Sequence, residues 1–174
     1  GLILNAVFIP IPALLPAYTS KVLAADASVG GLPLAAQGVG GITATVAIAS
    51  LGFVINKGNL GLICLVLGSI SVLVLAQSHW LTLSIAMLII LGISQSTFIV
   101  STQTLIQSMV PDTLRGRITS IYMLEFGLGP IAIILIGILM DLTTVPIALT
   151  IVASVSLALS LVFLAAFKQV RRLE

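Results

Sequence analysis

Long apolar runs, separated by short polar segments, divide the chain into six parts. A helix that crosses a bilayer needs roughly 20 mostly apolar residues, and cutting at charges and turn-forming residues gives approximate spans of 1–20, 30–55, 60–77, 80–109, 116–140 and 146–167. The stretch 58–111 contains no Asp, Glu, Lys or Arg and suits two crossings, with Gln-Ser-His-Trp at 77–80 as the reversal. Because hydrocarbon leaves unpaired backbone groups unsatisfied, the pattern predicts an all-α integral membrane fold with six transmembrane helices.

The composition strengthens this prediction and excludes several classes of function. Of 174 residues, 59% are hydrophobic and 7% are charged, whereas a soluble domain carries roughly 25% charged residues. A net charge of +2 provides no nucleic-acid-binding face. The single cysteine, Cys64, and the single histidine, His79, cannot build a disulfide framework or a metal cluster. With no phosphate-binding loop and no catalytic triad, we expect no enzyme activity, no metal and no cofactor.

The chain begins at Gly1 and is already apolar at Leu2. No charged region precedes this stretch, so it does not resemble a signal peptide. We therefore expect the sequence to be a fragment, or to lack its natural start.

Basic residues are distributed unequally between the two sides of a six-helix arrangement. One side holds six of them and the other side holds Lys21 alone; the six are Lys57, Arg115, Arg117, Lys168, Arg171 and Arg172. The positive-inside rule places the richer side in the cytoplasm, so both termini are expected to be cytoplasmic in a cell inner (plasma) membrane. Asp112, Arg115, Gly116 and Arg117 form the expected cytoplasmic anchor, in which Asp112 can cap the fifth helix.

Polar residues inside the spans are candidates for a substrate path. Gln37 is the polar exception of the second span, and Gln103 and Gln107 share a face of the fourth, while Asn5 is a further candidate in the first. Hydroxyl residues also follow helical spacing in the fourth span, at Ser94, Thr97, Ser101, Thr104 and Ser108. The alternative is hydrogen bonding that holds helices together.

Glu125 is the one carboxylate clearly inside a span, about 12 Å beyond Arg117 along the helix. An intramembrane ionisable group is a functional candidate. It can serve as a proton site, as a contact for a cationic substrate, or as a structural group held by an arginine or by polar neighbours.

Prolines and small residues predict where the helices bend and where they pack closely. Pro10, Pro12 and Pro16 should kink or break the first helix, and Gly129 with Pro130 should bend the fifth. Such interruptions suit cavity lining or gating, or a packing kink. In the second span, small residues recur every four positions and predict close helix packing; they are Ala36, Gly40 and Ala44.

Three stretches, at 14–41, 102–124 and 127–141, carry family-like motifs. They resemble the enterobactin-exporter-like branch of the major facilitator superfamily, also called transmembrane secretion effectors. "LLPAYTSKVLAADASVGGLPLAAQGVGG" (14–41) resembles its seventh-to-eighth helix region, and "TQTLIQSMVPDTLRGRITSIYML" (102–124) its tenth-to-eleventh connection. "GLGPIAIILIGILMD" (127–141) resembles its eleventh helix. In the loop that is basic in the superfamily, only Gly52, Lys57 and Gly58 are comparable, and Glu125 matches no branch motif.

The resemblance implies that residues 1–174 form the carboxy-terminal half, helices seven to twelve, of a twelve-helix transporter that works by alternating access. Branch relatives export siderophores, macrolides or other amphiphiles, typically by proton antiport. The implied partners are a small-molecule substrate, protons, lipids and a missing amino-terminal six-helix half. The alternatives are a non-transporting membrane scaffold, an accessory membrane domain of a fused enzyme, and a stand-alone six-helix transporter acting as a dimer.

Overall fold

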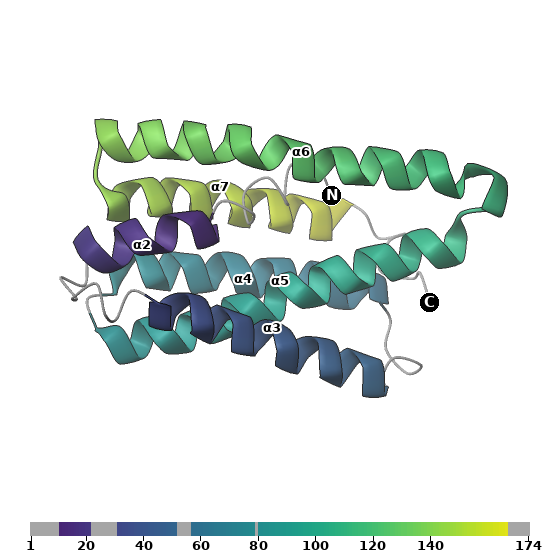
Figure 1. The fold of residues 1–174 in the computed structure, drawn as a ribbon, viewed down its shortest axis with the longest axis horizontal. Helices are drawn as coiled ribbons and strands as arrows, with labels where there is room; N and C mark the ends of the chain where they lie inside the picture. The colour runs from purple at the N-terminus through teal and green to yellow at the C-terminus, as the bar shows by residue number, and fades with distance from the viewer. Residues whose placement is uncertain (1–10, 22–30, 52–56, 79, 167–174) are drawn as a thin grey trace.

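The computed structural model describes residues 11–21, 31–51, 57–78 and 80–166. Its elements are six helices, labelled in Figure 1: α2 (Ile11–Lys21), α3 (Gly31–Leu51), α4 (Lys57–Gln77), α5 (Leu81–Met109), α6 (Asp112–Leu142) and α7 (Val145–Ala166). No strand occurs among these residues. The all-α prediction is confirmed.

Five of the helices are long and apolar enough to cross a membrane, within Leu32–Ser50, Asn59–Gln77, Leu81–Ser108, Gly116–Leu142 and Val145–Ala165. The uncharged stretch divides into α4 and α5 near Ser78, as the sequence predicts. The remaining helix, α2, has 11 described residues, and the first half of its expected span lies outside the described part of the chain.

The α5–α6 connection is shorter than the sequence suggests. Only Val110 and Pro111 separate the two helices, and α6 begins at Asp112, four residues before the expected start at 116. Pro111 occupies the N-cap position, so Asp112 is the first helical residue and not the cap. With 31 residues, α6 is about 46 Å long, longer than a hydrocarbon core of about 30 Å. The charged residues therefore occupy a helical extension, which projects beyond the other helices in Figure 1.

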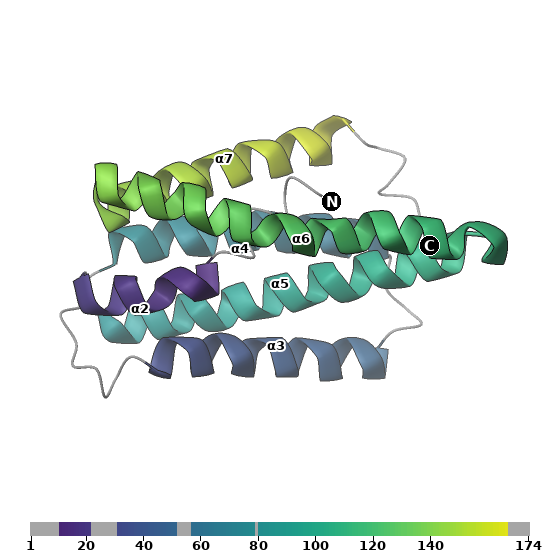
Figure 2. The same ribbon diagram turned by 45° about the horizontal axis from the view of Figure 1, so that its top comes forward.

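The helices lie side by side along the long axis of the molecule, with α3 and α6 towards opposite sides in Figure 1 and α3 and α7 towards opposite sides in the turned view of Figure 2. α5 packs against both α3 and α4, and α4 packs against α7. The short α2 contacts α3, α6 and α7. This arrangement leaves α3 paired mainly with α5, so the α3–α5 boundary remains accessible along one side.

Two polar connections hold the interior together. The Tyr18 hydroxyl, on α2, lies 2.9 Å from the carbonyl oxygens of Leu75 and Ser78 and 3.1 Å from the Ser84 hydroxyl. Between α4 and α7, the hydroxyls of Ser69 and Ser156 are 2.8 Å apart. Both clusters are buried. Apolar surroundings offer these polar groups no hydrogen-bond partner, so the groups bond to each other.

The predicted close packing of small residues is confirmed on α3. Ala36, Gly40 and Ala44 are all buried. A Cβ atom at Gly40 would overlap the carbonyl oxygen of Ile89 on α5, and one at Gly92 would overlap the carbonyl oxygen of Gln37 on α3. The two backbones therefore approach each other from both sides of the crossing, which only glycine permits at these positions.

The prolines that the structure describes inside helices do not end those helices. α2 continues through Pro16 and α6 continues through Pro130. Pro12 lies in the first turn of α2, where a missing backbone donor costs little because that donor has no intrahelical partner. Pro10 lies outside the described residues. A bend at Gly129–Pro130, and a gating role for any of these positions, stay predictions.

Candidate functional site

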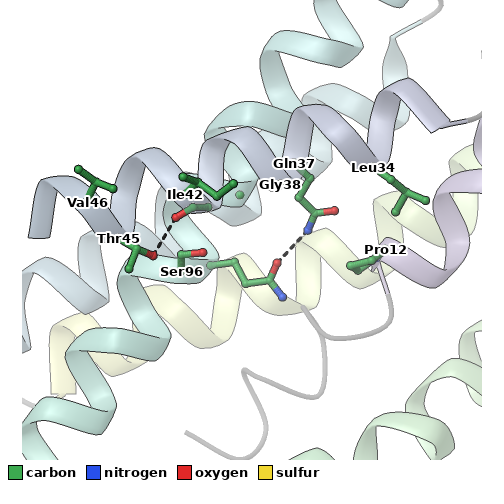
Figure 3. A pocket seen from close by; sticks show the side chains of 11 residues that line it. Pro12, Leu34, Gln37, Gly38, Ile42, Thr45, Val46 and Ser96 are labelled. Carbon is green, nitrogen blue, oxygen red and sulfur yellow. Dashed lines mark hydrogen bonds between the residues drawn. The ribbon is translucent and has the colours of Figure 1, made fainter. Parts of the chain in front are cut away.

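A pocket of about 570 Å³ opens between α2, α3 and α5. Its lining, shown in Figure 3, comprises Pro12, Leu34, Gln37, Gly38, Gly41, Ile42, Thr45, Val46, Gly92, Gln95 and Ser96. The volume falls within the roughly 300–1,000 Å³ of small-molecule sites. This is the candidate site for a small ligand.

The helical repeat of α3 supplies most of the wall. Its lining residues recur every three to four positions, as single residues or adjacent pairs, and therefore share one face of the helix; they run from Leu34 to Val46. Gly92, Gln95 and Ser96 of α5 face them, while Pro12 of α2 lies near one end (Figure 3). Gly41 leaves room for the Ser96 hydroxyl, because a Cβ there would lie 2.8 Å from it.

The polar centre of the pocket is a pair of side-chain amides. Gln37 Nε2 donates a hydrogen bond to Gln95 Oε1 at 2.8 Å, which joins α3 to α5. Gln37 is 8% exposed, and its Oε1 atom has no hydrogen-bond partner among the described residues. The Thr45 hydroxyl is already used, since it donates to the Gly41 carbonyl oxygen at 2.9 Å. The amide pair therefore offers the pocket's unused buried acceptor.

Chemically, the lining combines an apolar surface with amide and hydroxyl groups. No Asp, Glu, Lys, Arg or His lines the pocket where the structure describes it, and the described residues contain no cluster of three His, Cys, Asp or Glu that could hold a metal ion. Such a lining can bind and orient a neutral molecule through dispersion and hydrogen bonds.

The sequence identifies one of the two amides at this site. Gln37 lines the pocket, but Gln103 is half-buried and Gln107 exposed on α5, and neither belongs to the lining. Gln103 follows Gln95 by eight residues, about 12 Å along the helix. Asn5 lies outside the described residues, as does the side chain of Glu125, whose backbone belongs to α6. The site roles proposed for these residues stay predictions.

The hydroxyl stripe of α5 faces a different neighbour. Ser94, Thr97 and Ser101 are buried, and Ser101 lies beside the position that a Cβ of Gly61 on α4 would occupy. Thr97 is hydrogen-bonded to Cys64 of α4. Thr97 and Ser101 of the stripe thus lie against α4, whereas Gln95 and Ser96, which interrupt its spacing, line the pocket. The sequence signal for Gln95 is weak: it is a polar residue of the fourth span that does not follow the spacing of the stripe residues Ser94 and Thr97 on either side of it.

The predicted anchor lies in the first turns of α6. Gly116 and Arg117 are exposed there. Asp112 and Arg115 belong to the same helix, but their side chains lie outside the described residues. The exposed positions leave this end of α6 accessible to solvent or to lipid head groups.

No curated protein and no solved structure matches the chain. One family model matches the chain. The family that it describes consists of integral membrane transporters, not enzymes. Because the model of the Major Facilitator Superfamily matches residues 2–174, the chain belongs to that superfamily.

Proposed function

We propose that this chain forms part of a secondary active transporter that exports a small amphiphilic compound in exchange for protons. The observation that carries the proposal is the pocket between α2, α3 and α5, a small-molecule-sized space in a chain of a transporter family. Its apolar wall suits the hydrophobic part of an amphiphile and its amides suit the polar part. Export in particular, and a siderophore or drug as the substrate, rest on the resemblance to the enterobactin-exporter-like branch.

Glu125 is the proposed proton site. It lies within α6, well inside the apolar window Gly116–Leu142. A carboxyl group that binds and releases a proton there would link substrate movement to the proton gradient. Gln103 and Gln107 of α5, and Asn5, are proposed as further polar positions along the path.

The proposed partner is a second six-helix half that closes the open side of the pocket, so that alternating access exposes it to each side in turn. We further propose that the membrane is the cell inner membrane and that both ends of this chain face the cytoplasm, as the basic connections suggest.

The test is transport by the protein that contains this chain, reconstituted into proteoliposomes that hold a pH-sensitive dye. A macrolide and a catecholate siderophore serve as substrates. We expect at least one of them to move only when a proton gradient is present, with matching proton flux. Failure of both to move, under either gradient direction, would contradict a role in export of such amphiphiles.

A matched pair of substitutions on α6 separates coupling from folding. Glu125→Gln should abolish substrate-dependent proton flux, because an amide cannot take up the proton. Asp141→Asn removes an exposed carboxylate at the far end of the same helix and should leave the flux unchanged. Equal flux in the two variants and in the unmodified protein would make Glu125 a structural residue.

A further inference from the structure

The amide pair at the centre of the pocket has unused hydrogen-bonding capacity. One hydrogen bond of 2.8 Å joins Gln37 to Gln95, and this leaves one carbonyl oxygen and one amino group of the pair without a partner in it. Exchanging oxygen and nitrogen in both side chains moves these atoms between the residues but preserves the set. The pair therefore presents one carbonyl oxygen and one amino group that are not used between the two residues, whichever way the amides are oriented.

Burial makes the unused acceptor significant. Gln37 is 92% buried and lines the pocket, and its Oε1 atom has no partner among the described residues. Buried polar groups are normally hydrogen-bonded, so an unpartnered oxygen in a residue that lines a cavity is a candidate to accept a hydrogen bond from a ligand.

The charge of the lining restricts the ligand further. The described lining residues carry no formal charge. An ionised ligand group would lose its hydration here without gaining a counter-charge, which strongly disfavours it. A neutral group with only an acceptor, such as an ester, would leave the Gln37 oxygen unpaired. The free acceptor and the free donor of the pair are separate atoms, so the complementary neutral group also carries its donor and its acceptor on separate atoms, as the N–H and C=O of a carboxamide do.

We propose that the Gln37–Gln95 pair selects substrates that carry an uncharged carboxamide or lactam, which donates its N–H to the free oxygen of the pair and accepts from the free amino group. This inference rests on the proposed transport function, because it assigns the substrate class of the same pocket. The apolar residues Leu34, Ile42 and Val46 then hold the hydrophobic body next to the amide.

Binding to the detergent-solubilised protein tests this selection without requiring transport. The probes share a naphthalene body: naphthalene-2-carboxamide, methyl naphthalene-2-carboxylate, 2-naphthylmethanol and ionised naphthalene-2-carboxylate. Measured by calorimetry, the carboxamide should bind about tenfold more tightly than the ester, since the ester leaves the buried oxygen unpaired. The carboxylate should bind more weakly still.

Substitutions assign the preference to the pair. Gln37→Leu removes the buried oxygen, and the double variant Gln37→Leu/Gln95→Leu removes both amides, so in each the carboxamide-to-ester affinity ratio should fall from about ten to about one. Gln77→Leu is the matched control: Gln77 is an exposed glutamine of α4 outside the lining, and this variant should retain the ratio. If one pocket variant fails to fold, the other still decides the outcome.

The results that overturn the inference are specific. Equal affinity for carboxamide and ester, or equal affinity for carboxamide and naphthylmethanol, refutes selection of an amide. A ratio that survives both pocket substitutions refutes the Gln37–Gln95 pair as its origin. A protein that exports amphiphiles in liposomes but shows no carboxamide preference overturns this inference alone, whereas carboxamide selection without transport overturns the proposed function alone.

Discussion

Replacing Gly92 with alanine should separate two helices that touch through their backbones. A Cβ atom at this position would overlap the carbonyl oxygen of Gln37 and would lie 2.9 Å from its carbonyl carbon and 3.1 Å from the backbone nitrogen of Gly41. These are backbone atoms of α3, which cannot turn aside as a flexible side chain can. Relief therefore requires that α3 and α5 move apart and lose contacts along their crossing.

The expected magnitude follows from two opposing effects. Overpacking of a well-packed interior typically costs about 1–3 kcal/mol, and alanine in a helix gains roughly 0.8–1 kcal/mol over glycine. Gly137 of α6 isolates the second effect, because a Cβ there would meet nothing within 4 Å. Gly92→Ala should thus be less stable than Gly137→Ala by about 1–3 kcal/mol in the free energy of unfolding.

The chain contains a suitable reporter for this measurement. Its one cysteine, Cys64, is 6% exposed on α4, so a thiol-reactive dye labels it only when the helices separate. Heating the purified protein in detergent with the dye gives the unfolding midpoint of each variant. Gly92→Ala should unfold at a lower temperature than the unmodified protein, and Gly137→Ala at the same or a higher one.

Gly40 permits a second, independent comparison. A Cβ there would overlap the Ile89 carbonyl oxygen from the opposite side of the same crossing. Once one alanine has separated the helices, the second meets less resistance, so the double variant should lose less stability than the sum of the two single losses. If Gly92→Ala matches Gly137→Ala, the backbone contact between α3 and α5 is refuted, and if the two losses simply add, the two glycines act independently and not through one separation of the helices.

Four further substitutions test other contacts and the orientation of the chain. Tyr18→Phe removes a hydroxyl that serves two carbonyls and a serine, so it should lower stability by about 1–3 kcal/mol in the same dye assay; an unchanged midpoint would argue against the contact. Ser69→Ala breaks the hydrogen bond to Ser156 between α4 and α7 and should cost roughly 0.6–1.7 kcal/mol. Ser160→Ala, whose hydroxyl bonds only within α7, should cost less, and the reverse order would contradict the assignment. Arg117→Cys should react with an impermeant maleimide only from the cytoplasmic side, and labelling from outside the cell would reverse the proposed orientation.

The amino-acid pattern by itself determined the class of fold. A helix pairs all the backbone N–H and C=O groups of a segment with each other, as hydrocarbon requires. The lengths of the apolar runs therefore predict α4, α5 and α7 to within a few residues of their observed ends. The four-residue spacing of Ala36, Gly40 and Ala44 likewise predicts a close helix approach, because small side chains on one helix face leave room for a neighbouring backbone.

Tertiary structure decided which polar residues share a pocket. Periodicity places a side chain on a face of its own helix, but it does not specify which helix that face meets. The regular spacing from Ser94 to Ser101 is therefore as compatible with a substrate path as with helix packing, and the structure places Thr97 and Ser101 against α4. Gln37 and Gln95 lie 58 positions apart and become partners only because glycines on α3 and α5 let the two backbones touch.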